Sequence, residues 1–233
     1  MKTRSLLFAL ITISFFSCYA PKSFTHAVPT FEMSDILPLE ALTYIQLIER
    51  GSRMVYSDSL SERSCYMIHD ALKNTAQIPL SDTIYFWDRN DLKTVEHEIQ
   101  FLIKHARIAN KNQQVAITPT IYEAIKSSGK RFGLITYSEG FKRSNNNYVG
   151  QIVLGVLIGV ATMGTVMYMP YKSSSTMSFI IVDVEKDEVS FFGSSVRQDV
   201  DPLNPKLIDL QIKDVFRKEF KAPKAQSTNY YDF

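Results

Sequence analysis

The chain has 233 residues, of which 45% are hydrophobic and 21% are charged, and its formal net charge is +2. This length fits one domain of ordinary size, and the composition excludes wholesale disorder. Neither a basic surplus that would indicate nucleic acid binding nor an acidic surplus that would indicate a cation store is present.

The first seventeen residues have the organisation of a bacterial lipoprotein signal peptide. Lys2 and Arg4 precede an apolar run, 6–16, that is too short to span a bilayer. A small residue followed by Cys18 then resembles a lipobox, in which the signal is removed and the cysteine carries lipid chains. An ordinary signal peptide cleaved near Ala20 and an uncleaved anchor are the alternatives. Removal of 1–17 would leave 24 basic and 24 acidic residues.

The first half of the chain predicts a spacer followed by alternating strands and helices. Residues 18–39 contain three prolines and no sustained hydrophobic period, which is typical of a tether. Apolar patterns then predict strands at 42–49 and 84–87 and helices at 59–74 and 91–106. Cys65 falls within the first of these helices, where a small buried hydrophobe is the expected role.

The second half contains the strongest β pattern. A helix from Thr118 to Gly129 is followed by a strand at 132–141 with apolar residues on both faces, as expected near the centre of a sheet. A hairpin turning at 185–187 comes after an apolar segment, and a final amphipathic helix is expected at 205–220. The tail 222–233 is polar.

The apolar segment 148–169 has 22 residues and no charge. Its glycines recur every four or five residues and include the Gly155-x-x-x-Gly159 spacing that allows close helix approach. They are Gly150, Gly155, Gly159 and Gly164. Three interpretations stay open: a helix in or on a membrane, a helix or loop buried against the domain or a sister subunit, and membrane β-strands.

The residues that could carry chemistry do not form a recognisable catalytic set. His97 and His105 lie eight residues apart, too far for a common metal ion, and phosphate-binding and nucleophile motifs are absent from the sequence. The carboxylates near the hairpin turn, Asp183, Glu185, Asp187 and Glu188, are explained by turn chemistry. We therefore expect no catalytic residue, no metal site and no cofactor.

The hairpin FIIVDVEKDEVSFFGSS and the preceding strand RFGLITYSEGF resemble a family signature of strand, Asp, turn and strand. The family comprises the curli-secretion-channel lipoproteins, the lipoproteins that activate penicillin-binding proteins, and the N-terminal domain of TolB. Asp183 matches the family aspartate, whereas Asp187 and Glu188 stand where Thr-Gly is expected. The run Asn147–Ile152 is similar to a Gly-rich segment of uncharacterised envelope lipoproteins. The resemblance implies a non-enzymatic role as pore, synthase activator or scaffold, with no active-site residues to carry over.

Together these observations predict one α/β domain at 40–221, a mixed sheet covered by helices, with 148–169 as an apolar insertion. The predicted protein is anchored by lipid at Cys18, on the periplasmic side of the outer membrane. It binds envelope proteins or itself, and not nucleic acid. An oligomeric pore or transport component with 148–169 in the membrane is the alternative, and a hydrolase of envelope polymers is the third possibility.

Overall fold

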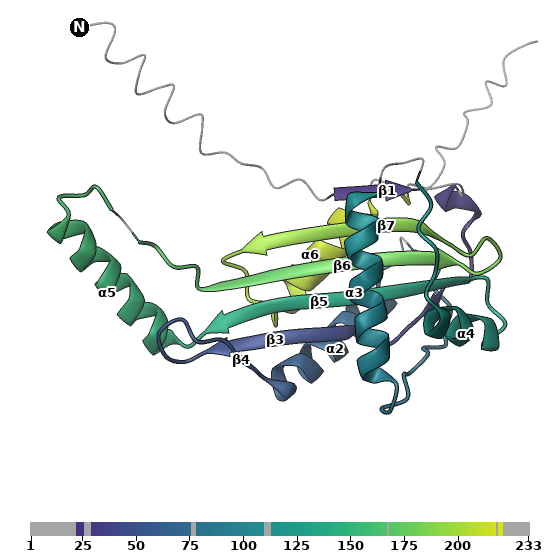
Figure 1. The fold of residues 1–233 in the computed structure, drawn as a ribbon, viewed down its shortest axis with the longest axis horizontal. Coiled ribbons are helices and arrows are strands. Elements are labelled where there is room, and N and C mark those ends of the chain that lie inside the picture. The colour runs from purple at the N-terminus through teal and green to yellow at the C-terminus, as the bar shows by residue number, and fades with distance from the viewer. Residues whose placement is uncertain are drawn as a thin grey trace, which may run out of the picture.

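The protein folds as one mixed sheet with helices on both faces (Figure 1). The computed structural model describes residues 22–25, 29–75, 78–109, 113–166, 168–217 and 219–220. The strands are β1 (Lys22–Thr25), β2 (Leu37–Pro38), β3 (Leu42–Ile48), β4 (Val55–Tyr56), β5 (Phe132–Arg143), β6 (Ser173–Asp183) and β7 (Glu188–Gln198). The helices are the 3₁₀ turn η1 (Thr30–Glu32), α2 (Asp58–Lys73), α3 (Leu92–Ile108), α4 (Pro119–Ser127), α5 (Asn145–Ala161) and α6 (Pro205–Phe216).

The seven-stranded sheet has the order β1-β7-β6-β5-β3-β4, with β2 also paired to β5. The two pairings β2–β5 and β3–β5 are parallel and the others are antiparallel. The long central strands β5 and β6 pair over their whole length, from Phe132 opposite Asp183 to Lys142 opposite Ser173. The predicted mixed α/β sheet covered by helices is therefore confirmed.

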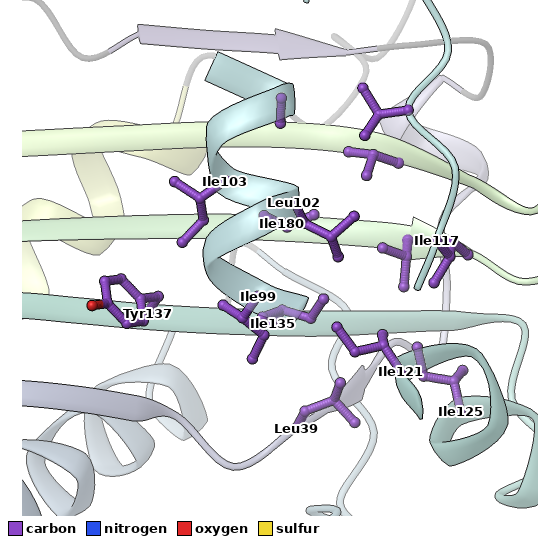
Figure 2. Close-up of a cluster of buried hydrophobic side chains, with 14 of the residues drawn as sticks. Leu39, Ile99, Leu102, Ile103, Ile117, Ile121, Ile125, Ile135, Tyr137 and Ile180 are labelled. Carbon is purple, nitrogen blue, oxygen red and sulfur yellow. The ribbon is translucent and has the colours of Figure 1, made fainter. Parts of the chain in front are cut away.

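Each face of the sheet has its own core. Figure 2 shows Ile99, Leu102 and Ile103 of α3 lying over Ile135 of β5 and Ile180 of β6. On the opposite face α2 and α6 cover Phe179 and Phe191, and Phe216 stacks on Phe191 with ring centroids 5.3 Å apart. Because both faces are covered, the central strands have apolar residues on both sides, as the sequence of β5 predicts.

Helix α2 closes the edge of the sheet next to β3 with polar side chains. The Ala41 N–H donates to Nε2 of His69 at 3.0 Å, and the Ile45 N–H donates to Oγ of Ser61 at 2.9 Å. Both acceptors are buried. An open edge would leave these N–H groups free to pair with another chain, so the side chains of α2 take the place of a further strand.

Two sequence predictions are corrected. Of the expected tether 18–39, residues 22–25 form β1 against β7, and Met33, Ile36 and Leu37 are buried in the domain. Prolines interrupt this segment, and its apolar residues are buried at irregular intervals. No regular hydrophobic period therefore indicates from the sequence that they belong to the core. The expected strand 84–87 is wrong as well, because only Tyr85 makes a bridge, to Leu39. Cys18 and the tail 222–233 lie outside the described residues.

Candidate functional site

The most unusual feature of the molecule is an arm that projects from the end of the sheet. We define the arm as residues 145–171, comprising α5 and the return 162–171, which leads into β6 and is non-helical at 162–166 and 168–171. It contains no Asp, Glu, Lys or Arg. Figure 1 shows α5 extending away from the layers, beyond the ends of β5 and β6. The predicted apolar insertion is therefore largely a helix outside the core.

The base of the arm is held by a buried cation. The guanidinium of Arg143, at the end of β5, donates to the carbonyl oxygen of Tyr171 at 2.9 Å, to that of Gly51 at 3.0 Å and to Oδ1 of Asn147 at 3.0 Å. The amide of Asn147 donates to the same Gly51 carbonyl, at 3.0 Å. These bonds tie both ends of the arm to the β3–β4 turn, so the arm leaves the domain in one direction.

Helix α5 begins and ends with polar caps. The side chain of Ser144 accepts from the Asn147 N–H at the first turn. At the other end the hydroxyl of Thr162 donates to the Ile158 carbonyl at 2.8 Å, and Gly164 adopts φ +80, which lets the chain reverse. The return then passes so close to the helix that a Cβ on Gly155 would lie 2.1 Å from the Tyr168 carbonyl oxygen.

The rest of the arm presents apolar side chains to the outside. Leu157 is 61% exposed, Val160 is 74% exposed and Met163 is 95% exposed. The other exposed large hydrophobic residues of the arm are Val149, Val153, Leu154, Val156, Val166, Tyr168, Met169 and Tyr171. Within α5 only Asn147 and Gly155 are buried. A helix that is apolar around most of its circumference is normally covered, either by protein or by lipid.

The four glycines proposed from the sequence occupy different environments. Gly155 faces the return of its own chain and Gly164 makes the turn after α5, so neither is open to a partner helix in the way that the Gly155-x-x-x-Gly159 spacing suggests. A Cβ on Gly150 would meet nothing within 4 Å, and Gly159 is half-buried. Among the described residues no helix combines the length and hydropathy needed to cross a membrane.

A second candidate is a cleft of about 500 Å³ between α2 and the segment that follows β2. Its lining includes Cys65, His69, Glu40, Glu62 and Trp87. Burial, reinforced by Glu40 and Glu62, raises the pKa of the Cys65 thiol to about 11, so the thiol is protonated at neutral pH. Burial also lowers the pKa of His69, and Lys73 lowers it further. His69 is thus a neutral acceptor for the Ala41 amide. Cys65 is only half-buried and packs against the edge of the core, whereas the sequence predicts a buried residue.

The remaining candidate residues do not converge. The buried carboxylate of Asp183 accepts from Arg131 at 2.7 Å and from the Glu185 amide at 3.0 Å, which is the turn chemistry expected at this hairpin. His105 contacts the Phe101 carbonyl of its own helix, at 2.8 Å. Within the described part of the chain no group of three His, Cys, Asp or Glu residues is arranged to hold a metal ion.

The sequence does not indicate the role of Arg143. The available signal is its position, because Lys142 and Arg143 are the last charged residues before a long uncharged segment. The partner Gly51, however, lies 92 residues earlier in the chain, and no local pattern indicates that contact.

No family model matches this chain, and no curated protein matches it. Solved structures match the fold at low similarity. The PelC dodecamer from Paraburkholderia phytofirmans is 8% identical with a TM-score of 0.38, covering 87% of this chain and 99% of that one. The LpoB C-terminal domain from Salmonella enterica is 8% identical with a TM-score of 0.29, covering 72% and 86%. A DUF4136 family protein from Bacteroides thetaiotaomicron is 8% identical with a TM-score of 0.31, covering 85% and 94%. At these values the likenesses carry no statement about function.

Proposed function

We propose that this protein is a non-enzymatic, lipid-anchored component of the bacterial cell envelope that works by binding protein through its arm. The observation that carries the proposal is the arm itself. It has a fixed base, no charge over residues 145–171, and apolar side chains that are more than half exposed along α5. Such a surface is stable in water only when a partner covers it.

The anchor would hold the domain close to the membrane. If Cys18 carries lipid, only three residues lie between it and the first residue of β1, Lys22, which is a step of four positions along the chain. A chain of that length reaches at most roughly 14 Å. The sheet would therefore lie beside the lipid headgroups, which confines copies of the protein to a thin layer and raises their effective concentration for one another and for other anchored proteins.

The chemistry of the cleft supports a non-enzymatic role. Its thiol is protonated at neutral pH and its imidazole nitrogen Nε2 already accepts from a backbone amide. The imidazole joins α2 to the backbone directly before β3, and the half-buried thiol packs against the core, so both groups have a structural task. The positioned base and activated nucleophile that covalent catalysis requires are not paired here.

The proposal is tested by metabolic fatty-acid labelling and membrane fractionation of the wild type and Cys18→Ala. We expect the variant to lose the label and to be recovered in the soluble fraction, folded. A variant that loses the label, lacks residues 1–17 by mass spectrometry and still resists extraction with alkaline carbonate would place the arm in the bilayer and favour the pore or transport alternative. A wild type without label would refute the lipid anchor.

A further inference from the structure

We propose that the partner covering the arm is a second copy of this chain, and that α5 helices of several copies associate along a stripe of four valines. This inference rests on the proposed function, because it names the protein that the arm binds. The stripe consists of Val149, Val153, Val156 and Val160.

The spacing of the four valines is that of a helix–helix seam. They are separated by four, three and four residues, which is the alternation of a and d positions in a heptad repeat. At about 100° per residue the four side chains fall within roughly 60° of the helix circumference. They are 58%, 53%, 52% and 74% exposed in chain order. The stripe lies away from Gly155, the position at which the return covers the helix.

The exposed apolar area is large enough for a stable interface. The exposed hydrophobic side chains of the whole arm present on the order of 1,000 Å² per copy, and each partner of a standard interface contributes about 800 Å². The valine stripe is part of that area, so the interface extends from the stripe to the neighbouring exposed side chains of the arm. Monomeric proteins rarely leave a continuous apolar patch of this size open to water. An identical helix offers the same uncharged stripe, so association brings no like charges together.

Three features of the arm favour protein over lipid as the covering partner. The described residues of the return, 162–166 and 168–171, are not helical, and backbone of that kind occurs at hydrocarbon depth only where protein or a water-filled cavity surrounds it. Lys142 is paired with Asp201 at 2.5 Å. Arg143 is buried and bound to carbonyl oxygens. Two cations at the base of the arm are therefore engaged within the domain instead of being presented to lipid phosphates.

The residue type in the valine stripe indicates an assembly of more than two copies of the chain. β-branched residues at both a and d positions favour trimers or larger assemblies over dimers. Leu157 is exposed next to the stripe, and Gly150 and Gly159 border it on its two sides, where their lack of side chains lets neighbouring helices approach. Gly150 and Gly159, two of the four glycines that the sequence indicated, therefore lie beside the inferred interface.

The test is cysteine cross-linking in the full-length protein in its native membrane. In a Cys65→Ala background, Val153→Cys places a thiol on the stripe, and Leu154→Cys places one about 100° around the helix. The two native side chains are similarly exposed, at 53% and 48%, so Leu154→Cys is a matched control for accessibility. We expect oxidation to cross-link Val153→Cys into covalent dimers and to leave Leu154→Cys and the background monomeric.

A second measurement determines the number of copies. Native mass spectrometry of the protein in mild detergent should give a species of more than two chains. The double variant Val153→Asp/Val156→Asp should give a folded monomer, because both side chains are exposed in the single chain and their replacement leaves the core intact.

The other outcomes separate this inference from the proposed function. Val153→Cys could fail to cross-link and yet be protected from a maleimide in the membrane, with the protection lost in denaturant. Another molecule would then cover the arm, which would overturn self-association and leave the proposed function standing. If both thiols react freely in the membrane, the arm is uncovered, and the proposed function falls with the inference. Equal cross-linking at both positions would show random collision and would overturn the valine seam.

Discussion

At the scale of single residues, His69 shows how a buried titratable group can serve the fold. Its imidazole accepts from the Ala41 amide and must be neutral to do so. Its pKa lies below the ordinary 6.5 because burial, and then Lys73, disfavour the cation. Phe86 packs edge-on to the ring, with centroids 6.4 Å apart. The side chain is therefore a fixed part of the sheet edge.

This arrangement predicts a pH-dependent stability. As the pH falls below about 6.5, the unfolded chain takes up the proton before the folded protein does, so the free energy of unfolding decreases until the lowered folded pKa is reached. Above about pH 7 the group contributes no pH dependence. Urea denaturation of the wild type and His69→Gln at pH 7.5, 6.5 and 5.5 measures the effect.

We expect His69→Gln to be less stable than the wild type at pH 7.5 and to lose part of the wild-type decrease between pH 6.5 and 5.5. His97→Gln is the matched control, because His97 is exposed on α3. An identical pH profile for the wild type and His69→Gln would contradict the role assigned to His69.

At the scale of elements, replacing two glycines of α5 by alanine should change the stability of the arm in opposite directions. At Gly150 a Cβ meets nothing within 4 Å, so Gly150→Ala should stabilise the isolated helix by about 0.5–1 kcal/mol through helix propensity. At Gly155 a Cβ would lie 2.1 Å from the Tyr168 carbonyl oxygen, so Gly155→Ala must displace the return.

Hydrogen exchange of the arm amides distinguishes the two variants. Protection should increase along α5 in Gly150→Ala and decrease around the return in Gly155→Ala, with the core of the sheet unchanged in both. The valine double variant is the background for this experiment, because it keeps association from contributing to protection. Equal protection in the two variants would show that the return does not pack on Gly155.

The base of the arm gives a second prediction at this scale. Replacing Arg143 by Met removes three hydrogen bonds and leaves the Gly51 and Tyr171 carbonyls with fewer donors. Hydrogen bonds to charged groups contribute about 1.5–3 kcal/mol each, but removing the buried guanidinium also removes the cost of burying its charge. We therefore expect the free energy of unfolding to fall by about 2–4 kcal/mol, less than the sum over three bonds. The adjacent Lys142→Met removes an ion pair with Asp201 that is partly exposed, which should cost less than about 1 kcal/mol.

Chemical denaturation measures this difference. Hydrogen exchange at Gly51 and Asn147 shows whether the loss is located at the base of the arm. Equal effects of the two substitutions would argue against Arg143 as the group that fixes the arm.

At the scale of the whole molecule, the position of β1 determines the distance between the domain and the membrane. Because β1 begins at Lys22, a lipid on Cys18 leaves no room for a long spacer. We expect neutron reflectometry on a supported bilayer to find protein density directly against the headgroups. Inserting twenty Gly-Ser residues between Ala20 and Pro21 should open a hydrated gap of roughly 25 Å. A similar gap in the wild type would mean that β1 separates from β7 at the membrane.

Much of the architecture follows from the sequence alone. The apolar periods of α3, β5, β6, β7 and α6 are long and regular, so each segment indicates its own structure before any tertiary contact is considered. The absence of charge from the arm and the resemblance of the sequence around Cys18 to a lipobox are likewise sequence properties. The proposed membrane-proximal binding role therefore depends first on composition.

Only the tertiary structure decided how the irregular parts are used. Met33, Ile36, Leu37 and Leu39 are buried at irregular intervals within the segment 29–39, and Tyr85 joins Leu39 through a single bridge. The Arg143 guanidinium donates to the Gly51 carbonyl oxygen, and the Tyr168 carbonyl lies against Gly155. These contacts join positions far apart along the chain or on opposite sides of a reversal, and no periodicity encodes them. The same is true of the valine stripe, whose spacing is visible in the sequence but whose exposure depends on the arm leaving the domain. Local patterns determine which segments form, and the competition among those segments for buried surface determines which remain uncovered.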